Sequence, residues 1–310
     1  MRTCQRLFAF RHIVASATAS AELRRRAYQA KQLQELSNWQ GHLVHDILAH
    51  EFISEIKAHR RPALSYLNGA VRRLAEQQVV FSREHRYREP GMTKAAAGRS
   101  YCALTLHQRG EDIGPAQISE TLELVGGCFE FLLSQTEFMS RLLTGRDHHS
   151  EVSLRFSLGD AWVKGTPDLV FLDAAGEIWI IDWKISNSLT SDYSHQLRLY
   201  GLAIVESRRW PAADVRSIRL IEANLLQRRL IEHPFSNELL DQTEDFAYRG
   251  ITELRELVDG GHFEDLRLEE LDVANRPTTC RYCNFSDLCI ESLLAEGRAK
   301  EAEVIQGTLL

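Results

Sequence analysis

The sequence contains no run of the roughly 18 to 20 consecutive apolar residues that a membrane-spanning helix needs. It has no internal repeat and no cleavable secretory signal with a clean apolar core. It also lacks the G-x-x-x-x-G-K-[ST] phosphate loop, so we expect no helicase motor in this chain. These absences predict a soluble cytoplasmic protein without membrane partners. The arginine-containing, acid-free stretch before Glu22 keeps organelle targeting open as an alternative.

The composition is that of an ordinary globular protein, with 44% hydrophobic and 26% charged residues among 310. A net charge of −6 argues against a uniformly basic protein that coats DNA. It does not exclude an enzyme whose basic groove is local and whose acidic site is neutralised by cations. We expect one domain over residues 1–310, with a mostly helical insertion or lobe at 55–147.

The hydrophobic pattern changes period after this helical region. Alternating apolar residues predict a half-buried strand at 152–158, and two short apolar runs predict interior strands at 169–172 and 178–181. The intervening residues 173–177 predict a tight turn between them. Helical spacing follows at about 194–205 and 236–259, with strands expected at 218–223 and near Leu230. The pattern indicates an α/β protein.

Two aspartates stand at the far ends of the predicted hairpin. Asp168 and Asp182 are each seven residues from Ala175, so strand pairing places them opposite one another. Lys184 points the same way as Asp182 because side chains alternate along a strand. Two close carboxylates repel, and a divalent cation such as magnesium removes that repulsion. A structural salt bridge of Lys184 with one aspartate is the alternative interpretation.

This stretch resembles the PD-(D/E)XK nuclease superfamily, and its RecB-like branch in particular. Pro167-Asp168 matches the first half of the signature, and Asp182-Trp183-Lys184 matches the second. The resemblance implies a restriction-endonuclease-like α/β core, a mixed central sheet flanked by helices. It also implies metal ligation by Asp168, Asp182 and the backbone carbonyl of Trp183, and a catalytic role for Lys184.

Two further segments are similar to the same branch. Gln196 and Tyr200 match a QxxxY helix motif, which implies contact with the site or with the DNA backbone. The helix around His45 is similar to one that carries a histidine near the metal. His45 shares a stripe with Leu48 and Phe52 and is therefore expected to face inward, as a metal ligand and catalytic residue or as a satisfied core residue.

A cysteine cluster with the pattern C-x2-C-x5-C lies at 276–292, formed by Cys280, Cys283 and Cys289. Zinc and iron–sulfur clusters usually take four ligands. The pattern is similar to the iron–sulfur staple of the AddB nuclease domain and of CRISPR-associated RecB-like exonucleases, which implies a 4Fe-4S cluster completed by an N-terminal cysteine. Cys4 is the best placed fourth ligand, with Cys102, Cys128, a zinc site or three unrelated buried cysteines as alternatives.

The resemblance implies a hydrolase, a deoxyribonuclease that uses Mg²⁺ or Mn²⁺. We expect an exonuclease acting on single-stranded DNA ends in repair, recombination or antiviral defence, with any helicase as a separate partner. A non-catalytic nucleic-acid-binding protein, or a structural subunit of a helicase–nuclease or defence complex, is the alternative.

Overall fold

The computed structural model describes residues 4–188, 191–207, 210, 214–256 and 266–309. The chain forms two compact units. The first contains Met1–Glu35, Gln77–Asp112 and Arg255–Leu310, and the second contains Leu36–Glu76 and Ile113–Leu254. Residues 55–147 therefore contribute to both units, and the single domain with an insertion stays a prediction.

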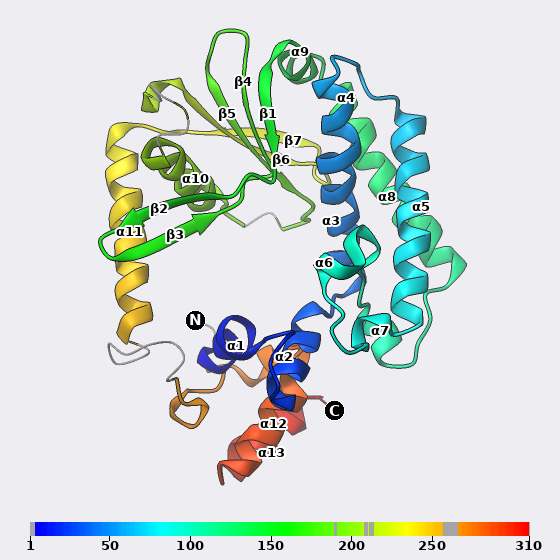
Figure 1. Cartoon of the computed structure of the whole chain (residues 1–310), viewed down its shortest axis with the longest axis vertical. Coiled ribbons are helices and arrows are strands. Elements are labelled where there is room, and N and C mark those ends of the chain that lie inside the picture. The colour runs from blue at the N-terminus through cyan, green and yellow to red at the C-terminus, as the bar shows by residue number, and fades with distance from the viewer. Residues whose placement is uncertain (1–3, 189–190, 208–209, 211–213, 257–265, 310) are drawn as a thin grey trace. The chain divides into compact units, whose positions relative to one another are not determined.

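The second unit is built on a five-stranded sheet of order β1-β4-β5-β6-β7. All neighbours pair antiparallel except β5 and β6, which run parallel, so the sheet is mixed as predicted. In Figure 1, β4 and β5 form the long hairpin of this sheet. The strands are β1 (Arg146–Ser150), β4 (Leu169–Leu172), β5 (Ile178–Lys184), β6 (Ile218–Asn224) and β7 (Arg229–His233).

The turn between β4 and β5 explains the register of this hairpin. Asp173 Oδ1 accepts hydrogen bonds from the backbone N–H groups of Ala175 and Glu177, both at 2.9 Å. Gly176 has φ +85°, a conformation that favours glycine. The resulting register pairs Leu169 with Ile181 and Leu172 with Ile178, which confirms the predicted hairpin.

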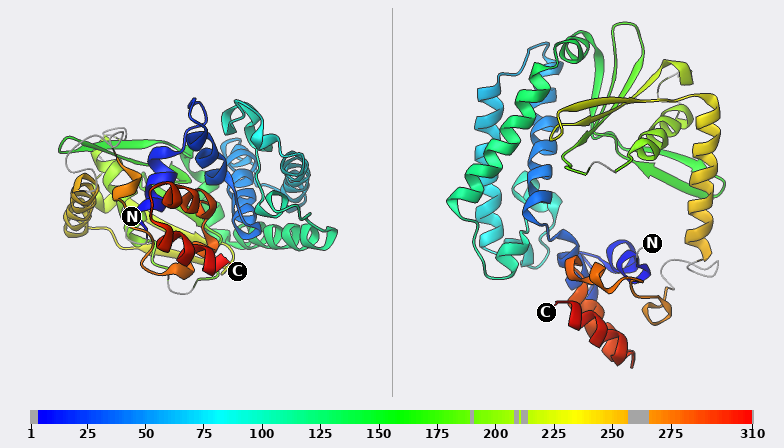
Figure 2. Two further views of the ribbon diagram at one scale, coloured as in Figure 1. Left: turned by 90° about the horizontal axis from the view of Figure 1, so that it is seen from below. Right: turned by 180° about the vertical axis from the view of Figure 1, so that it is seen from behind.

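One face of the sheet is covered by helix α10 (Ser194–Ser207) and by a separate antiparallel ribbon of β2 (Leu154–Leu158) and β3 (Ala161–Gly165). Leu154, Phe156 and Leu158 of the ribbon pack with Ile180 and Leu197 in one hydrophobic cluster. The ribbon lies beside α10 in both Figure 1 and Figure 2. The predicted strand at 152–158 is confirmed, including its alternating burial.

The opposite face carries the indole rings of β5. Phe138 of α9 (Thr136–Thr144) packs against Trp179 and Trp183, with ring centroids 6.5 and 6.2 Å apart. Helix α3 (Leu36–Ile47) continues through the π-helical segment η2 (Leu48–Phe52) into α4 (Ile53–Lys57). The other helical elements of this unit are α8 (Pro115–Ser134), η5 (Val215–Ser217) and most of α11 (Asn237–Glu256), while α5 (Leu64–Arg83) belongs to both units.

The first unit joins the two ends of the chain. Its N-terminal and C-terminal helices lie side by side in both views of Figure 2. The fully buried guanidinium of Arg6 bonds Glu296 at 2.9 Å, Ser292 at 2.8 Å and the carbonyl of Leu268 at 2.6 Å. The helical elements are α1 (Gln5–Ala9), η1 (Phe10–Val14), α2 (Glu22–Gln32), η3 (Arg86–Arg88), α6 (Lys94–Ala97), η4 (Gly98–Ser100), α7 (Thr105–Gln108), η7 (Leu268–Glu270), η8 (Pro277–Tyr282), α12 (Ser286–Ala295) and α13 (Ala299–Leu309).

The α/β fold class is confirmed, with two local differences. Strand β1 begins inside the stretch expected to be helical, which ends at residue 147, and β3 was not predicted. Helix α11 ends at Glu256, and residues 257–259 of the expected helix lie outside the described residues. No described helix has the length and apolarity to cross a membrane.

Candidate active site

The β4–β5 register continues one step beyond the strand to bring Asp168 opposite Asp182. Both carboxylate oxygens of Asp168 are engaged: Oδ2 accepts a hydrogen bond from the backbone N–H of Trp183 at 2.7 Å, and Oδ1 lies 2.9 Å from His45 Nδ1. The Asp168 side chain is 16% exposed. Its position is therefore fixed by β5 and by helix α3 together.

The side chains of Asp182 and Lys184 project from the same face of β5 and form an ion pair through Asp182 Oδ2 and Lys184 Nζ. Their side chains are only 4% and 15% exposed. Asp182 Oδ1 accepts a hydrogen bond from Gln196 Nε2 at 3.3 Å, whereas the buried Oδ2 is paired with the Lys184 ammonium. The alternative of a structural salt bridge therefore describes the contact of Asp182 with Lys184, but it does not account for the second carboxylate, Asp168, that the register brings opposite Asp182.

Helix α10 completes the cluster. Gln196 Oε1 accepts a hydrogen bond from Lys184 Nζ at 3.0 Å, and Gln196 Nε2 lies 2.7 Å from Tyr200 Oη. The Lys184 ammonium also lies 4.4 Å from the ring centroid of Tyr193, a cation–π contact that the sequence analysis missed. The predicted pair, one helical turn apart, thus contacts and orients Lys184 and Asp182.

Burial and like charge affect the protonation of Asp182. Burial, followed by the nearby charge of Asp168, raises the pKa of Asp182 to about 6. Burial lowers the pKa of His45, but the hydrogen bond and charge of Asp168 outweigh it, and the His45 pKa is raised overall. Burial also raises the pKa of Tyr200 to about 12, so its hydroxyl stays protonated and can donate at neutral pH.

The residues fit a hard divalent cation by the chemistry of their donors. Two carboxylates converge, and burial together with the charge of Asp168 raises the pKa of Asp182, a repulsion that a bound cation would relieve. The described residues contain no group of three or more His, Cys, Asp or Glu side chains placed to hold an ion. Magnesium does not require such a group, because it usually binds one or two carboxylates and completes its shell with water and substrate phosphate.

A second buried acid–histidine pair lies on the Asp182 face of the sheet. Glu222 stands beside Asp182 across the parallel β5–β6 pairing, and its Oε2 lies 2.9 Å from His233 Nε2. Both side chains are largely buried, 6% and 14% exposed. This pair was not predicted, although the acidic Glu222 at the fifth position of an apolar strand was a signal for it.

The cysteines of the first unit are brought together in part. Cys4, Cys280, Cys283 and Cys289 line one cavity of about 20 Å³, which leaves room for about one water molecule. Cys4 caps the N-terminus of α1, and burial raises the pKa of the Cys283 thiol to about 11. Cys102 and Cys128 do not line this cavity. The four thiols share one space, but they are not arranged as a preformed cage.

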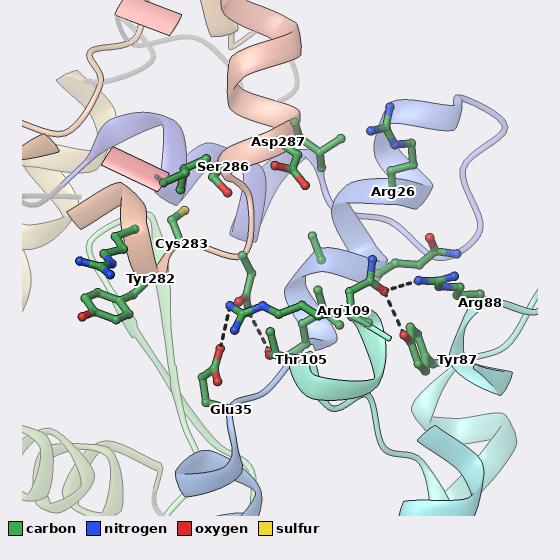
Figure 3. A pocket seen from close by; sticks show the side chains of 18 residues that line it. Arg26, Glu35, Tyr87, Arg88, Thr105, Arg109, Tyr282, Cys283, Ser286 and Asp287 are labelled. Atoms are coloured by element: carbon green, nitrogen blue, oxygen red, sulfur yellow. Dashed lines mark hydrogen bonds and ion pairs between the residues drawn. The ribbon is translucent and has the colours of Figure 1, made fainter. Parts of the chain in front are cut away.

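A larger pocket, of about 760 Å³, also lies in the first unit and contains none of the predicted catalytic residues (Figure 3). Its four arginines include Arg26, which binds Glu291 through two hydrogen bonds of 2.7 Å, and Arg109, which lies 3.8 Å from Glu35. Cys283 lines both this pocket and the cysteine cavity.

Comparison with known proteins gives a family match over most of the chain. The family described as the PD-(D/E)XK nuclease superfamily matches residues 1–290. No curated protein matches the sequence significantly. A solved structure entitled "Crystal structure of SSO0001" is 16% identical, with 69% of this chain and 80% of that chain covered and a TM-score of 0.28. At this identity and score, the likeness adds nothing to the family match.

Proposed function

Because the chain belongs to the PD-(D/E)XK nuclease superfamily, we propose that it hydrolyses phosphodiester bonds of DNA through Asp168, Asp182 and Lys184. One observation carries the proposal: Asp182 and Lys184 are joined in an ion pair opposite Asp168, and Gln196 holds them both. The cluster is mostly buried, so its charges interact more strongly than they would in water.

Asp168, Asp182 and the Trp183 carbonyl are the proposed ligands of Mg²⁺ or Mn²⁺, with His45 Nε2 as a further one. A bound divalent ion polarises a phosphoryl oxygen and lowers the pKa of water. Lys184 would place a positive charge beside the phosphate, while Gln196 and Tyr193 restrict its ammonium to one position. His45 holds Asp168 by donating Nδ1–H, which leaves its Nε2 lone pair available in the neutral ring.

We propose further an exonuclease of the RecB-like branch that acts on single-stranded ends, in repair, recombination or defence. The contacts of Gln196 and Tyr200 beside Lys184 support that branch, since these residues match its helix motif. The chain has no phosphate loop of its own, so a helicase would be a separate partner.

The four clustered cysteines are proposed to hold a structural metal, an iron–sulfur cluster or zinc. Their common cavity supports this assignment, and Cys4 is the proposed fourth ligand because it lines that cavity. The thiols would have to rearrange around either metal, and further for a 4Fe-4S cluster than for a single ion, since the cavity measures about 20 Å³. Anaerobic purification decides between them: a brown protein with absorbance near ~400 nm contains iron and sulfur, and a colourless one with stoichiometric zinc does not.

The nuclease proposal is tested with end-labelled single- and double-stranded DNA and RNA, each with Mg²⁺, Mn²⁺ or EDTA. Wild type is expected to cleave DNA with metal, and Lys184→Ala is expected to lose about 10²- to 10³-fold in rate. Lys57→Ala, an exposed lysine of α4, is the matched control and should retain full activity. A circular single-stranded substrate separates exonuclease from endonuclease.

Absence of metal-dependent cleavage by wild type on every substrate would overturn the proposal. The chain would then be a non-catalytic nucleic-acid-binding protein or a structural subunit. Equal cleavage by wild type and Lys184→Ala would overturn the role given to Lys184.

A further inference from the structure

The β2–β3 ribbon exposes an aromatic and basic surface that the catalytic cluster does not use. Trp162 is 68% exposed, although tryptophan is usually largely buried. Arg155 lies over its ring, 5.2 Å from the centroid. We infer that this outward face of the ribbon binds a single-stranded segment of nucleic acid, with Trp162 stacking on a base and Arg155 and Lys164 contacting phosphates.

Strand register places these side chains together. Trp162 pairs with Ser157, and Lys164 pairs with Arg155, so all four stand on the same face. The alternate residues Leu154, Phe156 and Leu158 are buried against the core. The ribbon is therefore anchored from behind and presents the Trp162 ring to solvent.

The charges on this face are uncompensated. Two cations directly opposite one another on paired strands destabilise the pairing. Neither Arg155 nor Lys164 forms an ion pair with a carboxylate among the described residues. The arginines of the large pocket in the first unit differ, because Arg26 and Arg109 have acidic partners there. An anionic ligand would neutralise the ribbon, and that ligand also has to offer a flat apolar surface to Trp162.

Single-stranded nucleic acid meets both requirements, since its phosphates bind cations and its unpaired bases stack on aromatic rings. In a duplex the bases are already stacked on one another. An acidic peptide supplies charge without flat rings at regular spacing. The observations therefore favour a single strand over either alternative.

The ribbon is connected to the catalytic cluster at its base. Gly165 ends β3 against the ring of Tyr200, where an added Cβ would lie 2.8 Å from Cε1. Tyr200 in turn contacts Gln196, which bonds Lys184 and Asp182. From Lys164 to Asp168 the chain spans at most roughly 14 Å, a few nucleotides of a strand. The inference rests on the proposed function only in assigning this strand as the substrate.

Binding is measured separately from cleavage, with full-length protein in EDTA and fluorescein-labelled single-stranded DNA and RNA oligonucleotides. Trp162→Ala should weaken binding about 5- to 150-fold, the range for losing one stacked base, and Trp162→Phe should restore most of it. The Arg155→Gln/Lys164→Gln variant should reduce the slope of log K against log salt by about 1.4, at ~0.7 per phosphate contact.

Two exposed residues of α11 serve as matched controls. Tyr248 is 54% exposed, and Arg249 is an exposed neighbour. Tyr248→Ala and Arg249→Gln should bind like wild type. Hydrolysis of bis(p-nitrophenyl) phosphate, which is too small to span the ribbon, should be unchanged in Trp162→Ala.

Unchanged oligonucleotide binding by Trp162→Ala overturns the inference. The inference also fails if Trp162→Ala weakens binding to heparin, a polyanion without bases, as much as it weakens binding to oligonucleotides. Equal or tighter binding of duplex DNA through Trp162 also overturns it. If wild type binds through Trp162 but never cleaves, the inference stands and the nuclease proposal fails. If the protein cleaves oligonucleotides but neither binding nor cleavage depends on Trp162, the nuclease proposal stands and the inference fails.

Discussion

The two proposed metal sites differ in how much of each is built by the protein alone. In the second unit, strand pairing and a hydrogen-bonded glutamine place Asp168, Asp182 and Lys184 before any ion arrives. In the first unit, four cysteines from a helix cap, a 3-10 segment and α12 share a small cavity without forming a cage. Oxygen ligands on strands can be positioned by the backbone, whereas thiol ligands on short helices and loops are often completed by the metal.

The largest expected effect separates the two sites. Asp182→Ala removes a proposed ligand and the partner of Lys184, so DNA cleavage should fall by about 10³-fold or more. Iron or zinc content should stay unchanged, because none of the four clustered cysteines lies in the catalytic cluster. Initial rates of cleavage and elemental analysis measure the two effects. If the Asp182→Ala variant also lost iron or zinc, the two sites would not be independent.

The converse substitution is Cys283→Ser. It should lower the content of bound iron or zinc and reduce the free energy of unfolding by several kcal/mol. In small zinc domains, metal binding contributes roughly 10–16 kcal/mol to folding. DNA cleavage should persist when it is assayed below the lowered unfolding temperature of the variant. Cys128→Ala, outside the cavity, is the control and should keep its metal. Calorimetry with elemental analysis tests this, and full metal retention by Cys283→Ser would remove it from the ligand set.

A third effect concerns the cost of building the active site in advance. The folded-state pKa of Asp182 is raised from 3.8 to about 6, so the folded protein holds this proton more tightly than the unfolded chain. Metal-free stability should therefore fall as pH rises from about 4 to 6, by up to about 3 kcal/mol. Asp182→Asn should remove this pH dependence and be more stable than wild type at pH 7 in EDTA. Urea unfolding curves measure this, and equal unfolding free energies of the wild type at pH 4 and pH 6 would contradict the prediction.

The smallest effect tests the orientation of the lysine. Tyr200→Phe removes one hydrogen bond to Gln196, worth about 0.5–1.5 kcal/mol, so the cleavage rate should fall about 2- to 12-fold. Tyr193→Phe keeps the ring beneath Lys184 and should act like wild type. Single-turnover rates measure the difference, and a larger loss in Tyr193→Phe would show that its hydroxyl, and not its ring, is needed.

The hairpin and its carboxylates could be predicted because they depend on local signals. Turn residues 173–177 fix the register, and alternation then determines which side chains converge. Tyr193 and the Glu222–His233 pair were missed because they reach the cluster through the β5–α10–β6 connection, and sequence spacing alone does not give that packing. Strand β1 was missed because its histidines and arginine hide the alternation of an edge strand.

The π-helical segment η2 has a consequence for the tolerance of this protein to insertions and deletions. A π turn holds one residue more than an α-helical turn, so it shifts the phase of everything that follows by about 100°. Upstream of it lies His45, and downstream lie the buried Ile53 and Ile56. Losing a single codon between 48 and 52 would turn the histidine away from Asp168 or the apolar stripe away from the core. This short stretch should therefore tolerate substitutions far better than changes in length.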